Sequence, residues 1–207
     1  MIQGMEKKQL RRALVAQRSG MDAAQRESCS RMACERLLQS ALWKRASGVL
    51  LTVSTPQELD TMPLLQAALG QGKPLFLPKC SGKKMSFYRL LELSDLRRGA
   101  FGLWEPPDET PLVPAPGLLL VAPAVACDRQ GFRLGMGGGY YDRFLKGFEG
   151  TTVCLVFEEL LFDFLPKEAH DVPVQVVMTQ SRAIDAAGLS DPVAGNSVAP
   201  WPHCSPR

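Results

Sequence analysis

The stretch GMGGGYYDR, residues 135–143, combines a bare backbone with charged side chains. Four of the five positions 135–139 are glycine, and Asp142 follows closely. A glycine-rich loop that leads into a helix lets backbone N–H groups converge on an anion at the positive end of the helix dipole. The Walker A and G-x-G-x-x-G patterns both fail, because no Lys-Ser/Thr pair ends the loop and Tyr140 occupies a glycine position. The stretch therefore favours an uncommon phosphate site, and a tight structural turn is the alternative.

Three carboxylates have both a structural and a functional interpretation. Asp142 lies in the first turn of the helix expected at 140–146, where it either stabilises the helix dipole or binds Mg²⁺ beside phosphates. Asp171 precedes a strand, as an ordinary turn residue or as a second magnesium ligand. Glu58 completes a capping box that begins at Thr55, but it also follows the first strand, where open α/β sheets bind ligands. Position alone does not decide between these interpretations.

Cationic and aromatic side chains extend the set of candidates. Lys7 and Arg11 lie one helical turn apart and form a cationic face, which is either solvated or directed at phosphates. Tyr88 and Trp104 fit the core of a domain, and they also fit the walls of a pocket for a planar ligand.

The elements that must position these residues alternate between helices and strands. Residues 5–18 show a helical pattern, and Asp22 with Gln25 predicts a capped second helix. The alternation that follows predicts an α/β fold: a single-domain, three-layer open sandwich with a mostly parallel central sheet and two N-terminal helices. Strands are expected at 48–53, 74–78, 85–90, 118–126, 152–157 and 174–178, and further helical segments at 56–69, 140–146 and 158–165.

Composition narrows the possible classes. With 207 residues, we expect one folded domain at 1–182 and a flexible tail at 183–207, which is rich in Pro, Ala, Gly and Ser. No apolar run reaches the roughly 20 residues of a membrane span. The net charge of +3 comes in short clusters, which favours small anions over nucleic acid. Without a signal peptide or a C-x-x-C pair, a cytoplasmic protein with neither disulfides nor structural zinc is expected.

The motif DRQGFRLGMGGGYYD, residues 128–142, is similar to the pattern D-x-x-G-x-R-L-G-x-G-x-G-Y-Y-D. That pattern is the signature of the 5-formyltetrahydrofolate cyclo-ligase family, also called methenyltetrahydrofolate synthetase, which the sequence resembles from Lys7 to about Thr179. Lys79 departs from the pattern, because many relatives have arginine there and lysine lacks its planar fork. Shorter matches occur in the same order at Lys7–Arg11, Pro56–Glu58, Leu77–Lys79, Met85–Tyr88, Gly102–Pro106 and 171–173.

The resemblance implies ATP-driven ring closure of 5-formyltetrahydrofolate to 5,10-methenyltetrahydrofolate, with release of ADP and phosphate and with Mg²⁺ present. Phosphorylation of the formyl oxygen would give an iminium phosphate, which the neighbouring amine attacks before phosphate leaves. Such a reaction needs positioning and charge neutralisation more than a covalent nucleophile. The implied partners are ATP and 5-formyltetrahydrofolate, with or without a polyglutamate chain, and a monomer is expected, with no nucleic acid or membrane partner.

The resemblance also implies residue roles by matching position. Arg133 and Asp142 are the expected catalytic residues, and Asp142 with Asp171 is expected to hold Mg²⁺. ATP is expected to contact Lys7, Lys8, Arg11, Arg133, Leu134, Gly135, Met136, Gly137, Gly138, Gly139, Tyr140 and Tyr141. The folate is expected to contact Val53, Glu58, Tyr88, Trp104, Met136, Gly137, Gly138, Gly139 and Tyr140.

Two other function classes fit the same residues. A binding protein would hold folate or nucleotide without turnover, although three intact carboxylates argue against a dead enzyme. A sugar-phosphate isomerase or a CoA-transferase-like enzyme is the second class, because similar α/β scaffolds host those reactions. These enzymes would turn over without ATP, so a nucleotide requirement separates them from a cyclo-ligase.

Overall fold

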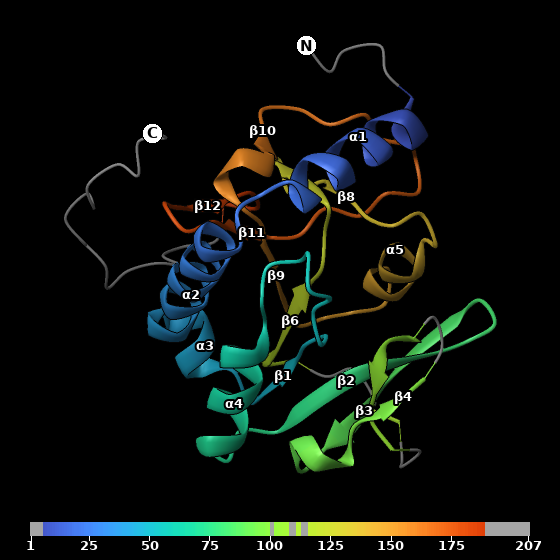
Figure 1. The fold of residues 1–207 in the computed structure, drawn as a ribbon. Helices are drawn as coiled ribbons and strands as arrows, with labels where there is room; N and C mark the ends of the chain where they lie inside the picture. The colour runs from blue at the N-terminus through green and yellow to red at the C-terminus, as the bar shows by residue number, and fades with distance from the viewer. Residues whose placement is uncertain (1–5, 100–101, 108–110, 113–115, 189–207) are drawn as a thin grey trace.

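A seven-stranded sheet forms the centre of the molecule (Figure 1). The computed structural model describes residues 6–99, 102–107, 111–112 and 116–188. The strand order is β12-β11-β9-β6-β1-β2-β3, with five parallel inner strands and an antiparallel strand at each edge. The strands are β1 (Gly48–Leu50), β2 (Leu75–Ser81), β3 (Lys84–Leu90), β6 (Leu118–Ala122), β9 (Thr151–Leu155), β11 (Val176–Met178) and β12 (Ala183–Asp185).

Helices cover both faces of this sheet, which confirms the predicted three-layer α/β fold. Figure 1 shows α2, α3 and α4 on one side of the sheet and α5 on the opposite side. Alternate strand residues divide between two apolar clusters: Val49 packs in the cluster that contains Leu37 of α2, whereas Leu50 packs in the cluster that contains Leu145 of α5. The helices are α1 (Lys7–Ser19), α2 (Ala23–Gln39), α3 (Ala41–Arg45), α4 (Met62–Gly70) and α5 (Tyr140–Leu145).

Strand β6 shows why the inner strands read as unbroken apolar runs. All of its residues, Leu118–Ala122, are buried, because helices cover both faces of a parallel sheet. The predicted strand at 118–126 is nevertheless two strands. Pro123, which has no N–H for a ladder, follows β6. The chain then enters β7 (Ala126–Asp128), which lies between β10 (Leu161–Phe162) and β8 (Arg133–Leu134) in a second sheet of order β10-β7-β8.

The N-terminal helices follow the prediction, and helix α4 does not. The Asp22 side chain accepts a hydrogen bond from the Gln25 N–H at 3.0 Å, so the predicted cap of α2 is confirmed. The predicted helix at 56–69 instead begins at Met62, whose N–H donates to the side chain of Asp60 at 2.9 Å. Pro63 lies at the first positions of this helix, where proline is favoured.

The remaining elements are short. The predicted helical turn at 158–165 is a 3₁₀ turn at Glu158–Leu160 followed by β10, so the prediction was only partly right. None of the helices in the described ranges is long and apolar enough to cross a membrane. The other short elements are η1 (Leu93–Asp95), β4 (Arg97–Arg98), β5 (Trp104–Glu105), β7 (Ala126–Asp128), β8 (Arg133–Leu134) and β10 (Leu161–Phe162).

The sheet continues past residue 182, where the predicted domain ends. Strand β12 pairs antiparallel with β11, with Ile184 opposite Val177. Residues 183–185 are therefore part of the folded sheet and do not belong to the predicted tail. The part of that tail at 189–207 lies outside the described residues.

Candidate active site

The glycine loop connects β8 to α5, and its backbone requires glycine at two positions. Gly137 has a φ of +98° and Gly139 a φ of +64°, a region that side chains disfavour. Arg143, on the first turns of α5, holds the loop against the helix by donating a hydrogen bond to the Gly138 carbonyl at 3.0 Å. The loop thus leaves its backbone accessible and is braced by the helix it starts.

The residues that precede the loop are structural. Asp128 is almost fully buried, and its two carboxylate oxygens accept backbone N–H bonds from Gln130, Phe132 and Leu165. Gly131 has a φ of +84°, and a Cβ there would lie 2.2 Å from the Val174 carbonyl oxygen. The first half of the signature therefore fixes a turn, and this turn delivers β8 and the glycine loop to the site.

Helix α1, near the start of the chain, brings one cation to the glycine loop and another to Asp171. The Arg11 Nε–H donates a hydrogen bond to the Gly135 carbonyl, and a Cβ at Gly137 would lie 3.3 Å from Arg11 Cζ. Lys7 donates to the Asp171 carboxylate. Lys8, the other predicted lysine, is exposed, and no contact within the described residues joins it to the loop.

Arg133 and Asp142, the predicted catalytic pair, contact each other directly. Arg133 Nη2 lies 3.2 Å from Asp142 Oδ1 and also donates to the Val172 carbonyl at 2.9 Å. The side chain of Arg133 is only 4% exposed, and its Nε has no acceptor in the described part of the chain. Asp142 Oδ1 accepts a second hydrogen bond, from the Val172 N–H at 3.2 Å. The pair ties α5 to the segment that carries Asp171.

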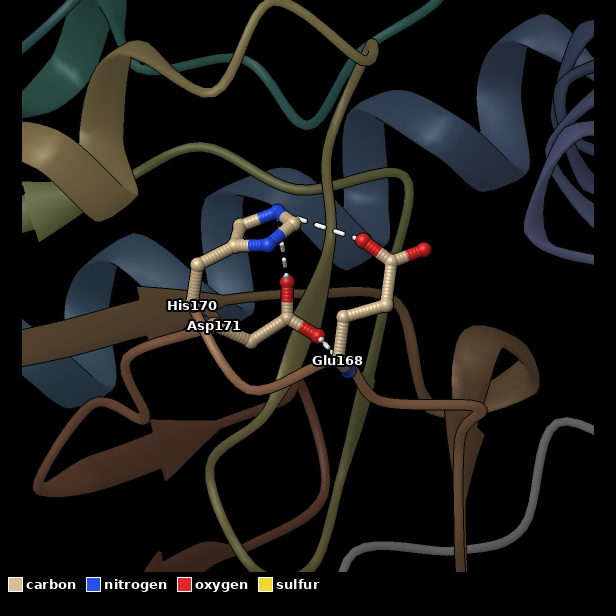
Figure 2. A group of neighbouring side chains, drawn as sticks. All are labelled: Glu168, His170 and Asp171. Atoms are coloured by element: carbon tan, nitrogen blue, oxygen red, sulfur yellow. Dashed lines mark hydrogen bonds and ion pairs between the residues drawn. The ribbon is translucent and has the colours of Figure 1, made fainter.

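Asp171 belongs to a cluster that could bind a metal ion. One ligand atom from each of Glu168, His170 and Asp171 lies within 4.8 Å of the others, and Figure 2 shows the three side chains turned toward one another. Burial alone would raise the pKa of Asp171, but the Lys7 hydrogen bond and the Glu168 N–H outweigh it, so this pKa lies below its usual value. Asp142 is not a member of the cluster.

A first cavity, which we call the loop cavity, lies beside the glycine loop. Its volume is about 310 Å³. It combines backbone from the loop with the Asp142 carboxylate and two cations. The lining residues are Gly137, Gly138, Gly139, Asp142, Arg143, Lys146 and His170. A polar, charge-rich cavity of this kind suits an anionic ligand.

A second cavity, which we call the β1 cavity, lies beyond the carboxyl end of β1. Its volume is about 400 Å³, and three predicted folate contacts line it together: Val53, Glu58 and Trp104. Glu58 Oε2 accepts a hydrogen bond from the Thr55 N–H at 2.9 Å, and Glu58 Oε1 lies 3.6 Å from Arg18 Nη2. The cavity thus combines apolar walls with charged side chains, among them Glu27, Asp60 and a Glu58 carboxylate that is held from two sides.

The remaining predicted contacts lie in different places. Tyr88 is on edge strand β3 and lines neither cavity. Met136 is 67% exposed within the glycine loop. The hydroxyl of Tyr140 donates to the Gly82 carbonyl at 2.7 Å. The hydroxyl of Tyr141 is buried without a hydrogen-bond partner in the described chain, and burial raises its pKa. Leu134 is buried.

Four arginines at these cavities were not predicted from the sequence: Arg26 and Arg98, which line the β1 cavity, and Arg18 and Arg143. Arg18 contacts Glu58, and Arg143 contacts the glycine loop while its guanidinium stacks on the Tyr140 ring at 5.0 Å. A signal for Arg18 exists in the sequence, because Lys7, Arg11 and Arg18 recur at helical spacing on one face of α1.

The match with a family model decides the family. The model described as 5-formyltetrahydrofolate cyclo-ligase family matches residues 3–180. The chain belongs to the 5-formyltetrahydrofolate cyclo-ligase family. The resemblance seen in the sequence is confirmed, and the two cavities described above lie in the part of the chain that matches this cyclo-ligase model.

Known proteins agree with this family. A 5-formyltetrahydrofolate cyclo-ligase of Mycolicibacterium smegmatis is 33% identical over 193 residues, which cover 87% of this chain and 96% of the relative. That of Haemophilus influenzae is 29% identical, over 82% of this chain and 95% of the relative. The structure of 5,10-methenyltetrahydrofolate synthetase from Aquifex aeolicus superposes with a TM-score of 0.79 at 31% identity, covering 97% of this chain and 100% of that one. The cyclo-ligase fold is therefore present over the whole domain.

Proposed function

We propose that the protein catalyses the ATP- and Mg²⁺-dependent cyclisation of 5-formyltetrahydrofolate to 5,10-methenyltetrahydrofolate, with release of ADP and phosphate. The observation that carries the proposal is the meeting of α1 with the glycine loop. Arg11 contacts the carbonyl of Gly135, although the two residues are far apart in sequence. Family membership indicates the reaction, and the contact brings a positive charge to the loop, where the reaction needs a site for an anion.

ATP would occupy the loop cavity. Its phosphates would be neutralised by backbone N–H groups of Gly137–Gly139 and by the cations Lys7, Arg11 and Arg133. P-loops combine backbone N–H groups with a lysine for the same purpose. The side chain of Lys7 is 17% exposed, so it is accessible to a phosphate oxygen. Arg133 is already fixed by Val172 and Asp142, which keeps its guanidinium aligned before a ligand arrives.

The residues at the loop cavity fit magnesium. Asp142 lines the cavity directly, and Asp171 lies in the segment whose backbone bonds to Asp142. Mg²⁺ prefers oxygen ligands and usually takes one or two carboxylates with phosphates and water. Asp142 and Asp171 would hold the ion, and bound Mg²⁺ would offset negative charge on the phosphates. Lys7, which now pairs with Asp171, would then be available to ATP.

The folate would occupy the β1 cavity. Trp104 and Val53 offer flat apolar walls for a planar ring system, and Glu58 offers a carboxylate for its N–H donors. Capping of a helix does not explain Glu58, because α4 begins at Met62 and not after Thr55. The carboxylate is therefore better explained as a ligand for the substrate, held in place by Arg18 and by the Thr55 N–H.

The proposed reaction has two steps, phosphorylation of the formyl oxygen and ring closure. The formyl oxygen first attacks the γ-phosphorus of ATP, so the bond to ADP breaks and an iminium phosphate forms. The neighbouring folate amine then attacks the activated carbon and gives up its N–H proton, the C–O bond breaks, and phosphate leaves with that proton as hydrogen phosphate. The protein would contribute alignment and charge neutralisation by Arg133 and the loop, which are the main sources of rate in phosphoryl transfer.

The test is the near-ultraviolet absorbance of methenyltetrahydrofolate. Purified protein is mixed with 5-formyltetrahydrofolate, with and without MgATP. We expect absorbance to rise only with MgATP, with one ADP formed for each methenyl product. A folded sample that binds ATP and gives no rise would refute the proposed reaction. Activity in the cytoplasm, as a monomer, stays a prediction of the sequence, and so does the use of polyglutamylated folate.

A further inference from the structure

Helix α1 contacts residues at or beside both cavities, although none of its own residues lines either one. Its first two turns place Arg11 at the Gly135 carbonyl of the glycine loop and Lys7 at the Asp171 carboxylate. Arg18 lies about three helical turns after Lys7, so the two side chains share one face of the helix. At that end of the helix Arg18 meets Glu58, which lines the β1 cavity. The proposed nucleotide and folate sites are thus built on the same helix.

Arg18 is an unusually buried arginine. The residue is 4% exposed, and arginine is rarely buried to this degree unless it is paired. Its Nη1 donates to the Ala124 carbonyl at 3.3 Å, in the connection between β6 and β7, and its Nη2 lies 3.6 Å from Glu58 Oε1. Its Nε is buried with no acceptor among the described residues, which costs free energy. A fold that needed only packing here would be served better by an apolar side chain.

The position of Glu58 depends on this arginine. Glu58 Oε2 is held by the Thr55 N–H, and Glu58 Oε1 has Arg18 as its ion-pair partner. The turn at 55–58 is closed separately by the Glu58 N–H, which donates to the Thr55 carbonyl at 2.9 Å. Without Arg18 the carboxylate would keep one hydrogen bond, about which it could still rotate. Two contacts fix the plane in which the carboxylate faces the cavity.

We infer that Arg18 is a positioning residue for folate recognition, acting through Glu58 and not by touching the substrate. The inference rests on the proposed function, because it takes Glu58 as a folate contact. A carboxylate oriented in advance binds donors without losing further freedom, so loss of Arg18 weakens folate binding and leaves nucleotide binding in place. Arg18 thereby differs in role from Lys7 and Arg11 on the same helix.

The test compares Arg18→Gln with Arg36→Gln. Arg36 is a matched control, because it too donates to backbone carbonyls, those of Thr179 and Gln180, but these residues, unlike Glu58, line neither cavity. We expect Arg18→Gln to raise the KM for 5-formyltetrahydrofolate roughly tenfold and to leave the KM for MgATP within about twofold. Arg36→Gln should lower thermal stability without changing either KM.

A double-mutant cycle shows whether Arg18 acts through Glu58. Folate affinity is measured by calorimetry without ATP for Glu58→Gln, Arg18→Gln and the double variant. We expect Arg18→Gln to add less than about a twofold loss of folate affinity when it is introduced into the Glu58→Gln variant, because the Arg18–Glu58 contact is already broken there. Fully independent losses would overturn the inference, and so would an Arg18→Gln variant that binds folate as Arg36→Gln does.

Arg18→Lys keeps the charge and serves if Arg18→Gln does not fold. A lysine has one ammonium group and cannot hold the Ala124 carbonyl and Glu58 as a fork does, so we expect a severalfold rise in the folate KM alone. Unchanged folate kinetics in Arg18→Lys would overturn the inference if the glutamine variant is unfolded. If the unmodified protein neither binds nor cyclises 5-formyltetrahydrofolate, the proposed function itself fails. If the unmodified protein is active and the Arg18 variant has the same folate kinetics, only the inference about Arg18 fails.

Discussion

The loop cavity and the β1 cavity are built in different ways. The loop cavity is lined mostly by one segment, residues 137–146, and His170 is its one lining residue from elsewhere. Charges from α1 lie close to it, because Arg11 contacts Gly135 and Lys7 contacts Asp171. The β1 cavity is lined by three separate segments, residues 23–30, 53–60 and 98–104. The buried Arg18 of α1 adds a long-range ionic contact to its Glu58. The first cavity suits a highly charged ligand, and the second suits a ligand recognised mainly by its shape.

The ion pairs in the two cavities also differ in how easily they exchange partners. The side chain of Lys7, in its pair with Asp171, is 17% exposed, whereas that of Arg18, in its pair with Glu58, is only 5% exposed. A lysine, with a flexible stem and a single ammonium group, can exchange a carboxylate for a phosphate more easily than an arginine whose fork holds two partners. A buried arginine that also holds a backbone carbonyl cannot move without leaving groups unpaired. We therefore expect electrostatic changes to dominate at the loop cavity and orientation to dominate at the β1 cavity.

The largest effect is expected for Asp142→Asn. The amide keeps the shape of the side chain but removes the charge that pairs with Arg133 and that would bind Mg²⁺. We expect kcat to fall by roughly 10²–10³, a loss typical of removing one preorganised charge contact from an active site. The rate of methenyl formation measures kcat, and calorimetry measures folate affinity, which should stay within about twofold. A loss of folate binding in this variant would show that the two cavities are not separate.

Arg11→Ala should act on nucleotide binding alone. Its guanidinium is the contact between α1 and the glycine loop, and a charged hydrogen bond of this kind is worth roughly a tenfold change in affinity. We expect the KM for MgATP to rise by about that factor, with the folate KM unchanged. Arg12→Ala is the control, because Arg12 is the next residue and is exposed. Equal effects of the two substitutions would mean that only the total charge of α1 matters.

Gly137→Ala tests the backbone of the loop. A φ of +98° is costly for alanine, and the new Cβ would lie 3.3 Å from Arg11 Cζ. We expect a loss of about 1–2 kcal/mol in the free energy of unfolding, measured by urea denaturation, together with weaker nucleotide binding. Gly147→Ala is the matched control, since a Cβ there meets nothing within 4 Å and its φ is not positive. A Gly137→Ala variant as stable as this control would contradict the backbone conformation described for the loop.

Most of the sheet could be predicted from the sequence, because its strands are short apolar runs between clear turn residues. The start of α4 could not be predicted. Two start signals compete there, the capping box at Thr55–Glu58 and the pair of Asp60 with Pro63. Both obey local rules, and only the tertiary structure selects the second, by bonding the Asp60 N–H to Ser30 of α2. The break at Pro123 was visible in the sequence, but the second sheet that β7 joins was not.

The candidate site was predictable where chemistry is concentrated in one segment and unpredictable where it depends on packing. The motif at 128–142 marked the loop and Asp142, and spacing placed Lys7 and Arg11 on one face. No local pattern indicates that Arg18 is buried against Glu58, because both residues have ordinary roles in their own segments. The motif marks Asp128, but its contact with the distant Leu165 N–H could not be predicted.

The smallest effect is expected at Cys34, which lies beneath the β1 cavity. Its thiol donates to the Asp60 carbonyl at 3.2 Å, and Asp60 lines the cavity. Burial first, and then the charges of Asp60 and Glu35, raise the pKa of this thiol to about 12. At pH 8 only about one molecule in ten thousand would carry the reactive thiolate, so iodoacetamide should modify Cys34 very slowly in the folded protein.

Ligands should change that modification rate differently at the two cavities. Bound folate would restrict opening of the segment that contains Asp60, so we expect 5-formyltetrahydrofolate to slow alkylation of Cys34 about twofold or more, as ligands that bind only the closed state do. MgATP alone, at the loop cavity, should leave the rate unchanged. Mass spectrometry of the Cys34 peptide measures the rate, and Cys34→Ala confirms the assignment. Equal protection by both ligands would mean that α1 transmits binding at one cavity to the other, and the separation of the two sites would then have to be abandoned.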